Sequence, residues 1–124
     1  MKHILIVDNN LGFLFWLGEA LSEAHHQAWP ACNVTDAGAI LRSRRLPRVD
    51  LLVVNPSVEG AMRLVQRLRR TRPDLKVLAV DPVNGEQVRG ITDWRARPHG
   101  GDRSARQEWL RHIERVIHVH KRAA

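Results

Sequence analysis

Three short apolar runs, each followed by a polar residue, constrain the fold of this chain more than any other feature. The runs are Ile4–Val7, Leu51–Val54 and Val77–Val80, and the residues that follow them are Asp8, Asn55 and Asp81. Because runs rich in Val, Leu and Ile alternate here with helical patterns, they predict strands buried on both faces of a parallel sheet. In such a sheet the functional crevice lies at the carboxyl ends of the strands, so we expect the three polar side chains to converge there.

Apolar side chains at helical spacing occupy the stretches between these runs. The first stripe follows Asp8 and predicts a helix of about fifteen residues, whose inner face is Phe13, Leu17, Ala20, Leu21 and Ala24. Three further helices are predicted: from the cap candidates Asn33 or Thr35 to about Arg45, from Ala61 to a stop at Pro73, and onward from a capping box at Ser104. The stretch Asn84–Gly90 has room for about two helical turns at most.

Two weaker strands complete the pattern. Gln27–Cys32 contains Pro30, which confines this strand to an edge of the sheet because proline cannot donate to the ladder. Asp93–Arg97 is predicted to be the last strand. The sequence therefore predicts an α/β fold in which five strands and five helices alternate along the chain.

Length and composition set simple bounds. A chain of 124 residues and 14.2 kDa is long enough for one domain with one core. Its one cysteine, Cys32, excludes an internal disulfide and favours a reducing compartment. The start has only four apolar residues before Asp8, too few for a signal peptide, and no stretch approaches the about 20 apolar residues of a membrane span. We therefore expect a cytoplasmic protein with no membrane segment.

Four segments combine the strands with distinctive polar residues. They are 4–10 with Asp8 and Asn9 at the strand end, 47–55 ending at Asn55, 72–81 ending at Asp81, and 90–98 carrying Arg97 and Pro98. In this order they resemble the receiver domains of two-component response regulators, the family of the chemotaxis regulators. The family's corresponding positions hold an acidic pair, the phosphorylated aspartate, a threonine or serine, and a lysine–proline pair.

The resemblance covers the whole chain and implies a specific architecture. It implies a single receiver-like domain over 1–124, with a flavodoxin-like, doubly wound, five-stranded parallel sheet in the strand order 2-1-3-4-5. The segment from Asp81 to Gly90 is shorter than the family's fourth helix usually needs. We therefore expect a shortened fourth helix, in the region that the family uses for signalling and pairing.

The departures from the family pattern matter more than the matches. Receiver chemistry needs a carboxylate nucleophile, magnesium held by acidic side chains, a hydroxyl and a lysine, and of the acidic set only Asp8 remains. The other positions of this degenerate pocket carry Asn9 for the second acid, Asn55 for the phosphoacceptor, Asp81 for the hydroxyl, and Arg97 before Pro98 for the lysine. A neutral carboxamide cannot form an acyl phosphate as a carboxylate does. Magnesium prefers anionic oxygens, so we expect its binding to be weak or absent, and we expect no other cofactor.

These substitutions predict a pseudo-receiver with an internal ion pair. If Asp8, Asp81 and Arg97 converge, the arginine can bridge both carboxylates with its forked donors. The alternatives are that Asn55-Pro56 and Asp81-Pro82 are ordinary turn signals, and that Arg97 is a solvated cation. Ser57, a lone hydroxyl nearby, is expected to cap the next helix. No nucleophile–base pair or glycine-rich phosphate loop is present in the sequence, so we expect no enzyme activity.

The chain is strongly basic, with a net charge of +7 and a pI near 11.2. Arginines gather in two places: Arg63, Arg67 and Arg70 on one predicted helix face, and Arg42, Arg44, Arg45 and Arg48 before it. Basic residues can neutralise nucleic-acid phosphates. Because no recognition-helix motif or aromatic stacking platform accompanies them, the sequence favours a solvated face, and a nucleic-acid partner is possible but not favoured.

Surplus apolar residues on the first predicted helix favour protein contact. Phe15 projects opposite the core stripe, and Leu11 and Leu14 lie outside its centre. We expect Leu11, Phe15 and Trp94 to contact a protein partner or a second copy. The leading function is therefore a receiver-like signalling and protein-interaction domain that is not phosphorylated. The alternatives are an atypical regulator that senses a small anion through Arg97, or a basic nucleic-acid-associated module.

Overall fold

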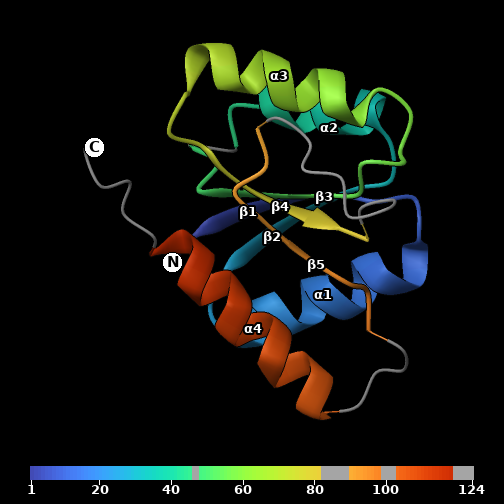
Figure 1. The fold of residues 1–124 in the computed structure, drawn as a ribbon, viewed down its shortest axis with the longest axis vertical. Coiled ribbons are helices and arrows are strands. Elements are labelled where there is room, and N and C mark those ends of the chain that lie inside the picture. The colour runs from blue at the N-terminus through green and yellow to red at the C-terminus, as the bar shows by residue number, and fades with distance from the viewer. Residues whose placement is uncertain (46–47, 82–89, 99–102, 119–124) are drawn as a thin grey trace.

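The protein alternates strands and helices around one parallel sheet (Figure 1). The structure is a computed structural model that describes residues 1–45, 48–81, 90–98 and 103–118. Its five strands are all parallel and lie in the order β2-β1-β3-β4-β5. This confirms the predicted fold class and the predicted strand order.

The strands match the apolar runs closely. They are β1 (His3–Val7), β2 (Gln27–Ala31), β3 (Leu51–Val54), β4 (Lys76–Val80) and β5 (Asp93–Arg95). As expected for a strand that contains Pro30, β2 lies at an edge of the sheet. The last strand is shorter than predicted, because it ends at Arg95 rather than at Arg97.

Four helices are present in the described residues. They are α1 (Leu11–Glu23), α2 (Val34–Arg42), α3 (Ala61–Thr71) and α4 (Arg103–Ile117). The expected short helix at Asn84–Gly90 lies, apart from Gly90, outside the residues that the structure describes. Asn33 rather than Thr35 caps α2, since its side-chain oxygen accepts from the Asp36 backbone N–H at 2.7 Å.

Two predictions about helix starts are wrong. Gly60, with φ of +79°, is the N-cap of α3, so Ser57 does not cap that helix. Glycine suits this position because a side chain is strained at positive φ. The last helix begins at Arg103, one residue before Ser104, so Ser104 is not its N-cap.

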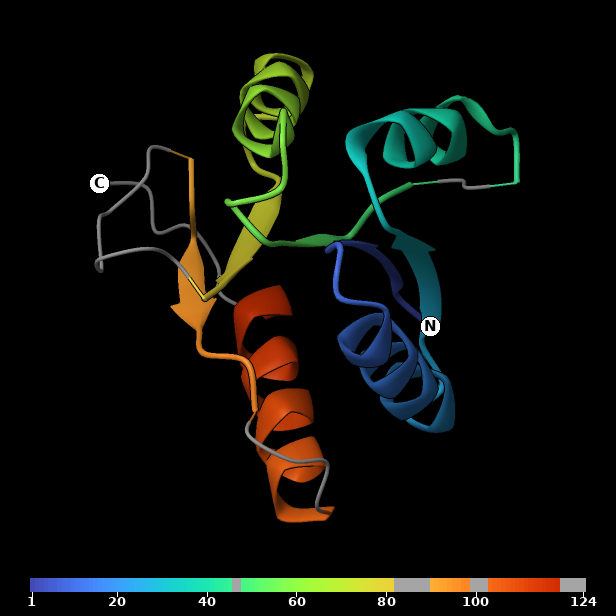
Figure 2. The same cartoon turned by 90° about the vertical axis from the view of Figure 1, so that its right-hand side faces the viewer.

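Helices cover both faces of the sheet, with α2 and α3 on one side and α1 and α4 on the other (Figure 2). Alternate residues of each central strand point to opposite faces, so the strands supply two separate apolar clusters. Phe13, Leu17, Trp109 and Ile113 belong to the cluster under α1 and α4, while Ala37, Ala61, Leu64 and Val65 belong to the cluster under α2 and α3. Leu14 also belongs to the first cluster and is buried, so the expectation that it lies outside the core is wrong.

The sheet brings the ends of three strands together. Val7 pairs with Val54, and Val54 pairs with Ala79, so Asp8, Asn55 and the residues after β4 leave the sheet at the same edge. Backbone hydrogen bonds continue this alignment, because the Asn55 N–H donates to the Val7 carbonyl at 2.8 Å.

Among the described helices, none is both long enough and apolar enough to cross a bilayer.

Candidate functional site

The Asp8 carboxylate is the centre of the polar cluster at the carboxyl ends of the strands. Its side chain is fully buried, and the Asn55 residue beside it is only 5% exposed. The Asp8 Oδ1 atom accepts from the Asn10 backbone N–H at 3.1 Å and from the Asn55 Nδ2 atom at 3.2 Å. Its Oδ2 atom accepts from the Arg97 Nη2 atom at 2.7 Å. Both carboxylate oxygens therefore face N–H donors, as a buried charge requires.

The Asn55 carboxamide is oriented by Ser57. Its Oδ1 atom accepts from the Ser57 backbone N–H at 2.9 Å and from the Ser57 hydroxyl at 2.7 Å. These two donors fix which end of the amide is the oxygen, so the Nδ2 end is directed at Asp8. Sequence reasoning missed this role of Ser57. The pattern Asn55-Pro56-Ser57 contained a usable signal, because asparagine side chains often bond the backbone two residues later.

Arg97 contacts two carboxylates of the site, those of Asp8 and Asp81. Its Nη2 atom pairs with Asp8, and its Nε atom lies 3.8 Å from the Asp81 Oδ2 atom. The Asp81 Oδ1 atom accepts instead from the Arg97 backbone N–H at 2.6 Å. The predicted bridging ion pair is thus present, with the Asp8 arm short and the Asp81 arm long. The Nε atom is buried and has no hydrogen-bond partner in the described part of the chain.

An aromatic ring supports the Arg97 guanidinium from α1. The guanidinium carbon lies 5.4 Å from the centre of the Phe13 ring, a distance typical of a cation–π contact. Phe13 is held in turn by the start of its own helix, where its backbone N–H donates to the Asn10 cap at 2.9 Å. The helix that follows the first strand therefore positions the arginine that the last strand delivers.

The residues present do not fit a magnesium ion of the kind that the family resemblance implies. Magnesium needs anionic oxygens with free lone pairs, held near octahedral geometry. The Asp8 oxygens instead face the Arg97 guanidinium and the Asn55 amide N–H group. Asn9 stands where the family has its second acid. It is an exposed amide, and no hydrogen bond to its side chain is found among the described residues. A cation is already in place here, and it is a side chain.

The other predicted residues lie outside this cluster. Pro98 is half-buried and follows Arg97 directly. Leu11 and Phe15 lie on α1, and Trp94 lies on β5, the edge strand opposite β2. All three are exposed, and Phe15 is the most exposed of them at 76%. The structure therefore confirms that Leu11 and Phe15 are exposed on α1. Trp94 is also exposed, but it lies on a different element.

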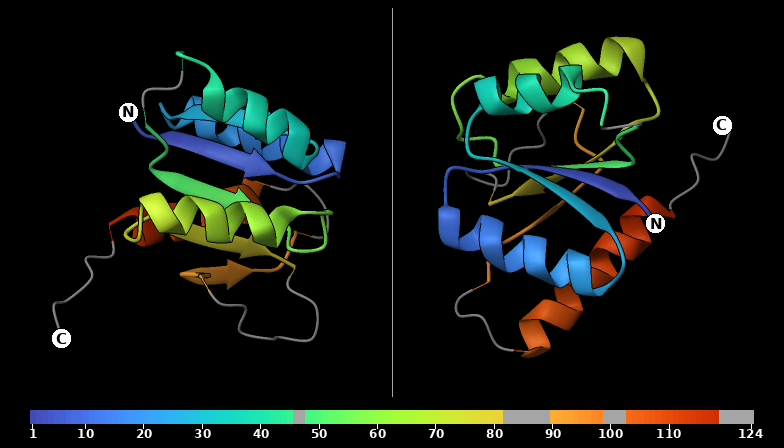
Figure 3. Two further views of the ribbon diagram at one scale, coloured as in Figure 1. Left: turned by 90° about the horizontal axis from the view of Figure 1, so that it is seen from above. Right: turned by 180° about the vertical axis from the view of Figure 1, so that it is seen from behind.

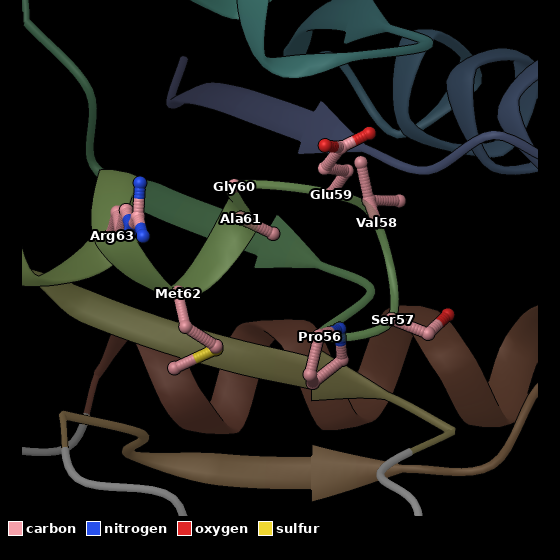
Figure 4. A pocket seen from close by; sticks show the side chains of 8 residues that line it. All are labelled: Pro56, Ser57, Val58, Glu59, Gly60, Ala61, Met62 and Arg63. Carbon is pink, nitrogen blue, oxygen red and sulfur yellow. The ribbon is translucent and has the colours of Figure 1, made fainter.

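A shallow hollow of about 560 Å³ is formed by the loop from β3 to α3 and by the first residues of α3 (Figure 4). Its lining is Pro56, Ser57, Val58, Glu59, Gly60, Ala61, Met62 and Arg63. Asp8, Asn55 and Arg97 do not line it. This hollow therefore does not test the crevice that the sequence predicts among the strand-end side chains.

A second polar cluster joins β5 to α4 and was not predicted, because its members are far apart in the sequence and meet only across two elements. The buried His112 lies with Nε2 at 2.7 Å from the Asp93 Oδ2 atom and Nδ1 at 3.2 Å from the Arg95 Nη1 atom. Since arginine can only donate, Nδ1 accepts and Nε2–H donates to Asp93. Burial alone would raise the pKa of Asp93, but hydrogen bonds from His112 and from the Trp94 backbone N–H lower it below its ordinary value.

No protein-family model matches this chain, and no curated protein matches it in sequence. Solved structures do match it. The chemotaxis response regulator CheY4 of Vibrio cholerae is 17% identical with a TM-score of 0.75, over 94% of this chain and 98% of that one. The non-phosphorylated HemR receiver domain from Leptospira biflexa is 22% identical with a TM-score of 0.76, and all of both chains is covered.

The response regulator TrrA from Thermotoga maritima, solved in complex with Mg²⁺-BeF, is a third match. It is 18% identical with a TM-score of 0.71, over 94% of this chain and 99% of that one. Identities this low establish shared architecture only. The chain has the fold of response regulator receiver domains, with five parallel strands in the order 2-1-3-4-5.

Proposed function

We propose that this chain is a receiver-like signalling domain that acts through protein contacts and does not depend on phosphorylation of an aspartate. The proposal rests on the fold and on one observation at its centre. Asn55 stands at the position that the resemblance assigns to the phosphoacceptor, and its amide is engaged on one side by Ser57 and on the other by Asp8. A carboxamide in this arrangement offers no carboxylate nucleophile.

The Arg97 contacts support a site that keeps one arrangement without an incoming group. The guanidinium is held by Asp8 at 2.7 Å and by the Phe13 ring, so a positive charge already balances the buried carboxylate. The half-exposed Asp81 would repel a phosphoryl group near the strand ends. We infer that the domain works in one state as an interaction module, in the cytoplasm and without catalytic activity.

The exposed face of α1 supports a protein partner or a second copy of the chain. Leu11 and Phe15 are four residues apart and therefore lie on the same helix face. Two large exposed side chains on one face are typical of partner sites. Trp94 on β5 offers a second exposed aromatic side chain at the sheet edge.

The small-anion alternative has weaker support. Arg97 is the cation that would bind the anion, yet its guanidinium and its backbone N–H already face two carboxylates. The buried Nε atom has no hydrogen-bond partner among the described residues, but it lies 3.8 Å from the Asp81 carboxylate, which would repel an incoming anion. An anion would have to displace a buried ion pair to bind, which costs more than a surface contact returns.

The proposal is tested by incubating the protein with a small-molecule acyl-phosphate donor and magnesium, and measuring its intact mass. The TrrA receiver domain, whose Mg²⁺-BeF complex has been solved, is the positive control in the same reaction. We expect a phosphoryl adduct on the control and none on this protein, because Asn55 has no carboxylate. A stoichiometric phosphoryl adduct on this protein, mapped to residues of the polar cluster, would overturn the proposal.

A further inference from the structure

The net positive charge of this protein comes from one segment of the chain. Residues 42–76 contain ten arginine and lysine residues against three acidic ones, so this segment alone accounts for the net charge of +7. The rest of the chain is balanced, with ten basic and ten acidic residues. A merely soluble surface would not require such a separation, because mixed charges of both signs serve solubility equally well.

Six arginines of this segment are exposed and have no ion pair with any residue that the structure describes. They are Arg42 at the end of α2, Arg44 and Arg45 just after it, and Arg63, Arg67 and Arg70 on α3. The other basic residues have structural roles. Arg69 donates to the Gly90 carbonyl, Arg72 to the Val49 carbonyl, and Lys76 to the Ile117 carbonyl. The arginines of this segment thus fall into two groups. Some stabilise the fold through hydrogen bonds to backbone carbonyls, and six are exposed without an ion pair to any described residue.

The six arginines belong to one side of the molecule. The helices α2 and α3 both lie over the same face of the sheet (Figure 3). The segment after α2 and the segment after α3 contact each other. Arg72 bonds Val49, and Arg48 lies 3.6 Å from Asp74, which brings the chain after α2 beside the chain after α3. We call this side the α2–α3 arginine face.

We propose that the α2–α3 arginine face binds the phosphate backbone of double-stranded DNA without sequence specificity. Exposed guanidinium groups match phosphate oxygens in charge and geometry. The large exposed apolar residues of the described chain are Met1, Leu11, Phe15 and Trp94, and none of them is on α2 or α3. A membrane-binding helix or a protein hot spot would need such residues beside the charges. Binding of single strands would need exposed aromatic rings for base stacking.

The shape of α3 favours DNA over duplex RNA. Arg63, Arg67 and Arg70 follow one exposed face of the helix over about 10 Å, at about 1.5 Å per residue. A helix with side chains is about 10–12 Å wide, which the major groove of B-DNA, about 12 Å wide, admits. The deep and narrow major groove of an RNA duplex excludes it. The arginine face can therefore contact both phosphate rows of a DNA groove at once.

The proposal is tested with a charge-matched pair of variants and a fluorescently labelled DNA duplex of about 20 base pairs and mixed sequence. The test variant combines Arg63→Gln, Arg67→Gln and Arg70→Gln on α3. The control combines Arg103→Gln, Arg111→Gln and Arg115→Gln on α4, which are also exposed but lie over the opposite face of the sheet. Fluorescence anisotropy at several salt concentrations gives the affinity and its salt slope. Thermal unfolding verifies that both variants fold.

We expect the test variant to lose about tenfold or more in affinity and its salt slope to fall by about 2–3, since each lost phosphate contact removes about 0.9 from the slope. The control should lose less than about threefold. Equal losses in the two variants would overturn the proposal, because net charge and not this face would then drive binding. Equally tight binding of single-stranded DNA or of duplex RNA would also overturn it, as would binding to anionic phospholipid vesicles with none to DNA.

Discussion

At the scale of single residues, Arg97 contacts two carboxylates through different donors. Its side chain donates to the buried Asp8, and its backbone N–H donates to Asp81 at 2.6 Å. The backbone bond depends on Asp81 itself, which adopts a positive φ of 47°, a conformation that aspartate tolerates better than most residues. The backbone bond to Asp81 and the ion pair with Asp8 thus both position the guanidinium. We expect the loss of the ion pair with Asp8 to reduce stability most.

Replacing Arg97 by alanine should destabilise the fold by about 3 kcal/mol, the lower end of the range for breaking a buried ion pair, because the arginine side chain is 26% exposed. Adding Asp8→Asn should recover part of this loss, since it removes the uncompensated buried charge. Urea unfolding of the wild type, both single variants and the double variant measures the coupling. Strictly additive effects would contradict a shared network.

Replacing Asn55 by aspartate should also destabilise the protein at neutral pH. The change removes the amide donor to Asp8 and places two carboxylates about 3 Å apart. One of the two pKa values then rises, so the penalty is present above that pKa and disappears below it. We expect a loss of about 1–2 kcal/mol at pH 7 that shrinks toward pH 4. A variant at least as stable as the wild type at pH 7, measured by urea unfolding, would contradict this account.

At the scale of elements, α1 carries apolar residues on two faces. Phe13 and Leu17 face the core, while Leu11 and Phe15 face solvent. The sequence pattern identified both faces but placed Leu14 on the wrong one. The buried stripe is wider than the helical period suggests because α4 also packs against α1, and Trp109 of α4 meets the Phe13 ring at 5.2 Å. Periodicity along one helix does not report such a neighbour.

Phe15→Ser should leave the free energy of unfolding within about 0.5 kcal/mol, because the ring is 76% exposed. The matched change Phe13→Ser should cost about 3 kcal/mol or more, since that ring is 4% exposed and supports Arg97. If Phe15 anchors an interface, its replacement also weakens association by up to about 2 kcal/mol. Thermal unfolding and sedimentation measure the two effects separately. A large loss of stability from Phe15→Ser would show that the helix face is wrongly assigned.

The contact between β5 and α4 gives a prediction about acid stability. The folded-state pKa of Asp93 is lowered, so the stability that its hydrogen bonds contribute is fully present above its unfolded pKa of about 3.9 and is lost as pH falls through the lower folded value. Asp93→Asn should therefore reduce the loss of stability between about pH 4 and pH 2, by less than about 1 kcal/mol because Asp93 is partly exposed. Urea unfolding at pH 6, 4, 3 and 2 checks this, with the exposed Glu19→Gln on α1 as the control. An unchanged pH profile would contradict a role for the pair.

At the scale of the whole molecule, the sequence predicted the architecture and the convergence of the site. Buried parallel strands produce continuous apolar runs, so Leu51–Val54 and its neighbours were visible without a structure. The convergence of Asp8, Asn55 and Asp81 was predicted from the parallel strands, whereas the pairing of Asp8 with Arg97 was predicted only on the condition that the family resemblance brings them together. The Ser57 contact, the Phe13 ring under Arg97 and the His112 cluster were not visible, because each depends on which side chains meet across separate elements. A linear pattern carries no such information.

The most direct test of the central claim is a titration of the ¹⁵N-labelled protein with magnesium and beryllofluoride, followed by backbone amide NMR. The signals to follow are those of Asp8, Asn55 and Ser57 in the polar cluster, and of Trp94 on β5. Because Arg97 and the Asn55 amide already occupy the Asp8 oxygens, we predict that none of these signals shifts in a saturable way. Saturable shifts at Asn55 and Ser57 that require both magnesium and beryllofluoride would contradict the account.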